Sequence, residues 1–288
     1  MIINSSSELT ITLCTLNEEK NISECLEALI KQDPYQIVLV DGDSDDQTRV
    51  IAEKYKVKVI NSGRKGLAYQ RKLAVENVQT KYLAILDADH RPEKDCLHEL
   101  IIEMENKNFD GIEAQIFSLS NSTYWDSSME QNFILDHNFP GPRNMIGTPC
   151  VYKSEVLKKN NFDPFFTGPS DDTDLCYRLT KLNYKLGVGT KKVFQVHRSN
   201  FREFKNKWIW YGKGDSQFVT AHPERLFSII KHLLFNYPIR KSYLAIKEKK
   251  FKLILFFVLC GVFRFYGFSK EMIKIFFGKK IDKDIYKT

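Results

Sequence analysis

The sequence predicts an α/β fold with a mostly parallel central sheet flanked by helices. Short apolar runs of strand length alternate with amphipathic stretches of helix length through the first 87 residues, a pattern typical of right-handed βαβ units. Three of these runs end on a polar residue, at Thr15, Asp41 and Asp87. Because open parallel sheets bind ligands outside the carboxyl ends of their strands, these three residues predict a binding site at that edge.

The first four strands are expected from apolar and β-branched runs that are too short for ordinary helices. They cover residues 9–15, 36–41, 56–61 and 82–87. The intervening helices are expected at 22–31, up to residue 55, and at 66–78. Asp33 and Pro34 end the first of these helices, and Ser44 or Asp45 can cap the second.

The alternation is less regular after residue 89, where Pro92 is expected to close the fourth strand region. Further helices are expected at 97–106, at 155–159 and from 171 onward, and further strands at 111–119, 147–152, 184–188 and 192–196. The stretch 120–142 is expected to be an irregular, aromatic-rich loop or a short helix.

Two acids, Asp87 and Asp89, stand two residues apart where the fourth strand ends. On a regular strand such side chains share a face, so the two carboxylates can converge. Their repulsion is relieved by a hard divalent cation that keeps positions open for phosphate oxygens. A solvated acidic loop is the alternative explanation.

Composition allows one large domain, or one domain with an appendage, in 288 residues of which 43% are hydrophobic. Six scattered cysteines without a Cys-x-x-Cys pair indicate reduced thiols in a cytosolic compartment. Residues 197–288 hold 20 Lys and Arg against 7 Asp and Glu, whereas the preceding part holds 23 against 29. A basic end on an acidic body favours contact with anionic lipid or nucleic acid.

Several stretches also match one known pattern in one order. They are Thr15-Leu-Asn-Glu-Glu-Lys-Asn-Ile, Val40-Asp-Gly-Asp-Ser-Asp-Asp-Gln-Thr, Gly66-Leu-Ala-Tyr-Gln-Arg71, Leu86-Asp-Ala-Asp89, Asn161-Phe-Asp-Pro, Asp171-Asp-Thr-Asp-Leu-Cys-Tyr-Arg178 and a strand closing on His197. With them the chain resembles family 2 glycosyltransferases of the GT-A fold, over roughly residues 8–215. The resemblance implies an inverting hexosyltransferase that uses Mn²⁺ or Mg²⁺. Its donor would be a UDP- or GDP-linked sugar, and its acceptor a lipid-linked or cell-surface glycan.

The resemblance also implies roles for individual residues. Asp172 takes the place of the catalytic base beside Asp171, and the N-terminus of a helix there is expected to keep a carboxylate ionised. The nucleotide-sugar would be bound by Thr15, Asn17, Glu18, Asp41, Gly66, Arg71 and Asp87. The metal ligands would be Asp89, Asp87 and His197. Asp41 is equally typical of a turn or helix cap, and a lone histidine such as His197 is often structural.

The aromatic-rich stretch 120–143 contains Trp125 and Arg143, which we expect at the acceptor site because aromatic faces stack on sugars. Ordinary core packing explains the same residues.

The basic end mixes Trp and Tyr with Lys and Arg, as segments at membrane interfaces do. The charge-free run 253–263 is shorter than the ~20 residues of a clean span. We therefore divide the chain into a catalytic domain at 1–215 and a helical region at 216–288. The latter is predicted to be an in-plane anchor, or at most one short span or hairpin, at the cytoplasmic face of the membrane. A helical cap or a dimer interface is the alternative.

Two other functions would each account for part of the sequence. A nucleotidyltransferase on a similar sheet would carry a glycine-rich basic loop after the first strand, whereas residues 15–19 are acidic. A nucleic-acid-binding protein would use the basic end. That end is richer in Phe, Leu and Ile than a phosphate-binding face, so no nucleic-acid partner is expected.

Overall fold

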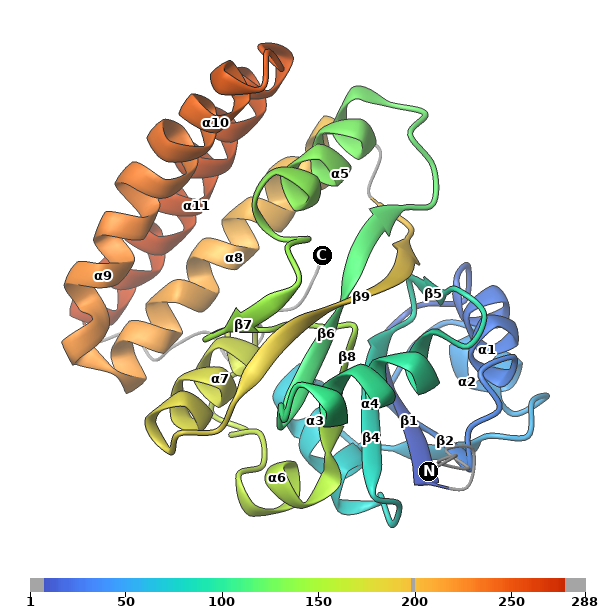
Figure 1. The fold of residues 1–288 in the computed structure, drawn as a ribbon. Helices are drawn as coiled ribbons and strands as arrows, with labels where there is room; N and C mark the ends of the chain where they lie inside the picture. Colours follow the sequence, from blue (N-terminus) through green and yellow to red (C-terminus); the bar gives the residue numbers. More distant parts are fainter. Residues whose placement is uncertain (1–7, 198–199, 278–288) are drawn as a thin grey trace. The chain divides into compact units, whose positions relative to one another are not determined.

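The structure is a computed structural model that describes residues 8–197 and 200–277 (Figure 1). Two compact units make up the chain. The sheet unit contains the residues up to Leu119 together with Asn138–Phe165 and Asp171–Val196. The helical unit contains Ser120–His137, Phe166–Ser170 and the chain from His197 onward. The predicted boundary at residue 215 stays a prediction, and residues 278–288 of that region lie outside the described residues.

One sheet runs through the sheet unit in the order β3-β2-β1-β4-β8-β6-β9-β5, with β7 paired to β9. Its strands are β1 (Leu9–Thr15), β2 (Gln36–Asp41), β3 (Lys58–Asn61), β4 (Tyr82–Asp87), β5 (His90–Pro92), β6 (Gly111–Ser118), β7 (Gly141–Arg143), β8 (Cys150–Lys153) and β9 (Leu186–Gln195). The predicted parallel pairing is confirmed for β1 with β2, β1 with β4 and β2 with β3. Beyond β4 the sheet is mixed, because β8 is antiparallel to both β4 and β6.

Helices cover both faces of this sheet (Figure 1). They are α1 (Ile22–Ile30), α2 (Thr48–Ala52), α3 (Leu67–Glu76), α4 (Cys96–Asn106), α6 (Ser154–Lys159) and α7 (Asp171–Lys181). The alternation of side chains along β-strands divides the core. Leu9, Ile11 and Leu13 of β1 pack in one buried cluster with residues of α1 and α4, whereas Val38 and Val40 of β2 pack with Ala74 of α3.

Two sequence-based expectations were wrong, and a third was met by one of its two alternatives. The two strands expected at 184–188 and 192–196 are one strand, β9 (Leu186–Gln195). It pairs parallel with β6 along its length, with a register shift between Glu113 and Gln115. Pro92 does not close the β4 region, since His90–Pro92 forms β5 and pairs with β9 after a tight turn. For the stretch 120–142, where a loop or a short helix was expected, the structure shows a helix of 13 residues, α5 (Tyr124–Asp136), capped by Thr123.

The helical unit consists of α5 together with α8 (Phe201–Ala221), η2 (Pro223–Arg225), α9 (Leu226–Lys231), the π-helix η3 (His232–Lys241), α10 (Ser242–Lys247) and α11 (Lys252–Phe276). Its core is aromatic: Trp125 stacks on Phe204 with ring centroids 4.5 Å apart, and Phe204 packs on Phe256. Glycines allow α8 and α11 to approach closely, since a Cβ at Gly212 would lie 1.9 Å from the carbonyl oxygen of Arg264. By length and composition α11 can cross a membrane.

Candidate active site

The carboxyl ends of β1 and β2 are joined by hydrogen bonds through Asp41. Its buried carboxylate accepts hydrogen bonds from Thr15 Oγ1 at 3.0 Å, from the Ser44 amide at 2.8 Å and from Ser44 Oγ at 2.6 Å. Arg49 Nε lies 3.7 Å away. Both carboxylate oxygens are therefore engaged within the protein, and Asp41 orders the turn after β2. Its role in binding a nucleotide stays a prediction.

The two predicted nucleotide-binding segments after β1 and β2 lie against each other. Asn17 has a φ of 55°, and its side-chain oxygen accepts a hydrogen bond from the Asp45 amide at 2.9 Å. The Glu18 amide donates to Thr48 Oγ1 at 2.8 Å. Gly66, with a φ of 140° that favours glycine, immediately precedes α3 at the same edge.

The turn between β4 and β5 brings Asp87, Asp89 and His90 together, with one ligand-type atom of each within 4.8 Å of the others. Asp87 Oδ2 accepts a hydrogen bond from Thr148 Oγ1 at 2.7 Å. Asp89 Oδ2 accepts one from Gln195 Nε2 at 3.1 Å. The two carboxylates are partly exposed, so they remain accessible from solvent while being held in place.

His90 is fully buried, and its ring is oriented by the backbone of the same turn. Nδ1 accepts the hydrogen bond of the Asp87 amide at 3.0 Å. A neutral imidazole in this arrangement carries its hydrogen on Nε2, which lies 3.8 Å from Asp89 Oδ1. Nε2 itself makes no hydrogen bond among the described residues, so His90 supports the turn through Nδ1, and its second nitrogen stands near Asp89.

Arg71 links the two ends of the site. It is buried on α3, and its guanidinium donates to Asp171 Oδ2 at 2.8 Å and to Asp87 Oδ1 at 3.4 Å. Its Nε is buried without a hydrogen-bond partner among the described residues. The N-terminus of α7 is thereby tied through one cation to the end of β4.

Whereas the neighbouring Asp171 is buried, Asp172 of α7 is partly exposed. Oδ1 accepts the Thr173 amide hydrogen bond at 2.7 Å. A Cβ at Gly147 would lie 3.4 Å from Oδ2, so glycine leaves the approach to that oxygen open. Desolvation, and then the Asp171 carboxylate, raise the pKa of Asp172 from 3.8 to about 7. Desolvation and the Asp171 charge therefore raise this pKa by more than the helix N-terminus, which was expected to keep Asp172 ionised, lowers it.

The donor set at the β4–β5 turn fits a divalent cation. Asp87 and Asp89 supply hard oxygen ligands, and so few protein ligands leave positions for water and phosphate oxygens, as Mg²⁺ and Mn²⁺ sites in nucleotide enzymes require. The third predicted ligand, His197, belongs to the helical unit, where its ring stacks on Phe133 with centroids 6.0 Å apart. A metal role for His197 stays a prediction.

The two residues predicted at the acceptor site fall in different units. Trp125 packs in the aromatic core of the helical unit, and Arg143 ends β7 in the sheet unit. The core-packing alternative describes the surroundings of Trp125, and its contact with an acceptor stays a prediction.

Sequence reasoning assigned no role to several residues that shape the site: His90, Thr148, Gln195, Gly147 and the buried Glu113, which adds to the negative potential at Asp172. Only His90 carried a signal, because it directly follows the acidic pair. The others approach from distant strands and loops, as Thr148 does across 61 positions.

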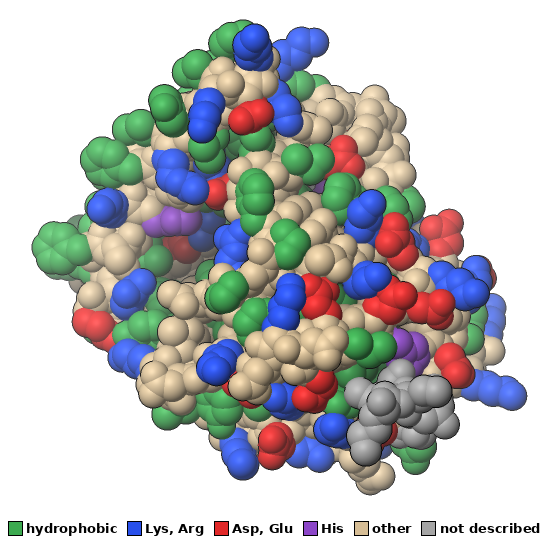
Figure 2. Space-filling view, in the orientation of Figure 1, with side chains coloured by type: hydrophobic (Ala, Val, Ile, Leu, Met, Phe, Trp, Pro, Cys, Tyr) green, Lys and Arg blue, Asp and Glu red, His purple; other side chains and the backbone are tan. Residues whose placement is uncertain are grey.

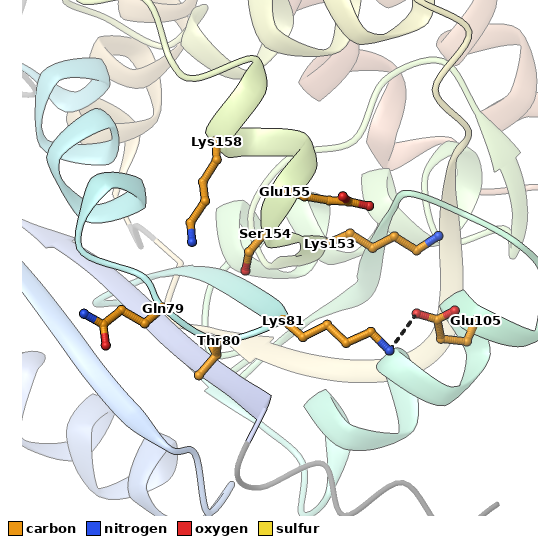
Figure 3. Close-up of a pocket in the computed structure, with 8 residues that line it drawn as sticks. All are labelled: Gln79, Thr80, Lys81, Glu105, Lys153, Ser154, Glu155 and Lys158. Atoms are coloured by element: carbon orange, nitrogen blue, oxygen red, sulfur yellow. Dashed lines mark ion pairs between the residues drawn. The ribbon is translucent and has the colours of Figure 1, made fainter.

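A separate pocket of 670 Å³ lies at the start of β4, the opposite end of that strand from Asp87 (Figure 3). Polar residues line it: Gln79, Thr80, Lys81, Glu105, Lys153, Ser154, Glu155 and Lys158. Lys81 pairs with Glu105, and Lys153 pairs with Asp110. The pocket therefore lacks the concentrated positive charge expected of a phosphate site.

Comparison with known proteins adds a family match. The family model described as Glycosyl transferase family 2 matches residues 10–165. A dolichyl N-acetyl-alpha-D-glucosaminyl phosphate 3-beta-D-2,3-diacetamido-2,3-dideoxy-beta-D-glucuronosyltransferase of Methanococcus voltae is 27% identical over an alignment of 240 residues, and the match covers 71% of each chain. The poly(ribitol-phosphate) beta-N-acetylglucosaminyltransferase TarS of Staphylococcus aureus is 28% identical over 132 residues, 38% of this chain and 23% of TarS.

The fold is shared with solved structures. The mannosyltransferase PcManGT from Pyrobaculum calidifontis, in complex with GDP-Man and Mn²⁺, superposes with a TM-score of 0.66 at 15% identity, covering 95% of this chain and 88% of PcManGT. TarS residues 1–349 with UDP-GlcNAc superpose with a TM-score of 0.56 at 17% identity, covering 97% and 89%. Both comparisons support the GT-A architecture predicted from the sequence.

Proposed function

Since the chain belongs to glycosyl transferase family 2 and is a glycosyltransferase, we propose that it is an inverting, metal-dependent hexosyltransferase with Asp172 as its base. The observation that carries this proposal is the bridge made by Arg71. Through Asp171 on one side and Asp87 on the other, it holds the base-bearing end of α7 next to the acidic turn after β4. A donor diphosphate on Asp87 and Asp89 would then lie within reach of a base.

In the proposed reaction an acceptor hydroxyl oxygen attacks the anomeric carbon of the donor sugar. The bond from that carbon to the nucleoside diphosphate breaks, and the hydroxyl proton passes to Asp172 Oδ2. This oxygen has no hydrogen-bond partner among the described residues, and Gly147 leaves it open. One base opposite one leaving group gives inversion at the anomeric carbon.

A divalent cation held by Asp87 and Asp89 would neutralise charge on the diphosphate leaving group. Around it the protein's own residues do the positioning. Thr148 and Gln195 orient the two carboxylates, and the His90 ring fixes the turn that carries them. The nucleotide would lie against the carboxyl ends of β1 and β2 and the start of α3, where Thr15, Asn17, Glu18, Asp41 and Gly66 stand.

We propose a UDP- or GDP-linked hexose as donor and a lipid-linked or cell-surface glycan as acceptor, at the cytoplasmic face of a membrane. The name of the Methanococcus voltae relative, which specifies a dolichyl-linked sugar phosphate, supports a lipid-linked acceptor. The apolar, basic helical unit supports a membrane location, with Trp125, Arg143 and His197 as candidate contacts of the acceptor or metal.

The test is a calorimetric titration of the protein with UDP and GDP, and with sugars linked to each, in Mn²⁺, in Mg²⁺ and in EDTA. We expect one nucleotide to bind with a metal only, and Asp89→Ala to abolish that binding. Glu76→Ala is the matched control, since it removes an exposed carboxylate at the end of α3. Binding that survives EDTA and Asp89→Ala would remove the metal from the proposal, and no binding under any condition would refute the donor class.

A further inference from the structure

Helix α11 carries two apolar stripes, and only one of them is covered. Leu253, Phe256, Phe257, Cys260 and Phe268 are buried. A second stripe on the same helix is exposed and consists of Leu255, Val258, Val262, Phe265, Tyr266, Ile273 and Phe276. Apart from the neighbours Phe265 and Tyr266, its successive members are three, four or seven residues apart, which is the spacing of one helix face.

The neighbouring helices carry a similar stripe. Phe227 of α9, Phe235 and Ile239 of η3, and Tyr243 and Ile246 of α10 are large, apolar and exposed. These helices pack along α11 within the helical unit. So many exposed apolar residues on adjoining helices mark an interaction surface rather than ordinary surface variation.

Basic residues lie between the apolar ones. Residues 226–277 contain ten Lys and Arg and only two Asp and Glu. Figure 2 shows blue basic side chains interleaved with green hydrophobic ones over these helices. This combination fits the interface of an anionic bilayer, where apolar side chains enter the headgroup region and Lys and Arg bind the phosphates.

The packing of α11 opposes a single transmembrane span. Arg264, in the middle of the helix, is mostly buried, with 18% of its side chain exposed, and donates two hydrogen bonds to Asp215 of α8, at 2.6 and 2.8 Å. Glu271 is fully buried, on the same covered side. A Cβ at Gly267 would lie 2.2 Å from the carbonyl oxygen of Ile209, so α8 and α11 are in backbone contact. Moving α11 into lipid would break this ion pair, which is costly.

A second copy of the chain is a poor occupant for the same surface. A two-fold dimer would place each patch on its own equivalent. Two strongly basic patches would then face each other, and like charges placed together oppose association. The net positive charge that disfavours a dimer favours an anionic lipid surface.

We infer that the exposed stripe of α11, with that of α9, η3 and α10, docks the protein in the plane of an anionic membrane, without α11 crossing it. This inference concerns the membrane partner named in the proposed function. Its test needs neither donor nor acceptor, so it fails or succeeds independently of the transferase reaction.

The experiment is co-sedimentation of the full chain with vesicles of phosphatidylcholine, with or without phosphatidylglycerol. The variant L255N/V262N/I273N removes one Leu, one Val and one Ile from the exposed stripe. The matched control L182N/V50N/I102N removes the same three residue types from exposed positions of the sheet unit. Circular dichroism establishes that both variants are folded.

We expect wild type and control to bind vesicles that contain phosphatidylglycerol, and the stripe variant to lose at least about a hundredfold in bound-to-free ratio. Alkaline carbonate should release the bound wild type, as it releases peripheral proteins. Equal loss in the control, no loss in the stripe variant, or resistance to carbonate would each overturn the inference. A wild-type dimer that the stripe variant dissociates, without vesicle binding, would assign the surface to a second copy instead.

Discussion

Replacing Arg71 with methionine separates two roles that this residue can have. The resemblance assigns Arg71 to the donor diphosphate, whereas in the structure its guanidinium pairs with Asp171 at 2.8 Å, and the side chains are 4% and 1% exposed. Removing one partner of a buried pair leaves the other charge uncompensated. Such a loss costs about 3–5 kcal/mol. We therefore expect R71M to destabilise the sheet unit without any ligand present.

Hydrogen–deuterium exchange of peptides from β1 and β4 is the suitable assay. Intrinsic fluorescence would report elsewhere, because Trp125, Trp208 and Trp210 all lie in the helical unit. A loss of about 3–5 kcal/mol corresponds to exchange that is roughly a hundredfold to several thousandfold faster in amides that open with the core. The double variant R71M/D171N should recover most of this loss, since no buried charge is then left unpaired.

The matched control is R49M. Arg49 also pairs with a buried aspartate, but it is 40% exposed and the distance is 3.7 Å, so its loss should cost less than about 1 kcal/mol. If the amides of R71M exchange at the wild-type rate and the variant only binds nucleotide more weakly, then the guanidinium binds the donor phosphate. Our assignment of Arg71 to a structural ion pair would then be wrong.

Two further predictions concern the acids of the site. Because the pKa of Asp172 is raised to about 7, its carboxylate is protonated below that pH, and kcat/KM should fall about tenfold per pH unit as the pH drops below 7. The variant D172N should lose about 10²–10⁴ in kcat. A pH profile that stays flat down to pH 5 would contradict the assignment of Asp172 as the base. If the role of His90 Nδ1 is to accept the hydrogen bond of the Asp87 amide, then H90N, whose Oδ1 replaces Nδ1, should keep near wild-type affinity for Mn²⁺. The variant H90Q should lose about 10–100-fold in Mn²⁺ affinity. Electron paramagnetic resonance titrations measure both. The opposite order would identify Nε2 as a metal ligand.

Local sequence was sufficient to predict those strands whose own residues carry the apolar pattern and the turn signals at both ends. The runs at Leu9–Thr15, Gln36–Asp41 and Tyr82–Asp87 are apolar and bounded by polar or turn residues, and their predicted bounds match the strands found. Helix α5 was predicted only as an alternative to a loop because its support is tertiary: Trp125 stacks on Phe204, and Tyr124 Oη donates to the Lys252 carbonyl across 128 positions. No window of local sequence contains such partners.

The site shows the same division. The strand pattern placed Thr15, Asp41 and Asp87 at one edge of a sheet, and the resemblance assigned roles to Asp89 and Asp172. The hydrogen bonds from Thr148 and Gln195 come from strands and loops that fold back much later in the chain. The buried pairing of Arg71 was also invisible, since an arginine on a helix is exposed more often than not.

The interleaving of the two units limits how such an enzyme can be recombined. The polypeptide passes between them five times, so the helical unit is assembled from an internal helix and a distal block rather than appended as a tail. A fragment ending at residue 215 would keep α5 and most of α8 but discard α11, exposing Phe204 and Trp208. Truncations and chimaeras must therefore exchange α5 together with the distal helices, because neither part can keep the aromatic core buried without the other.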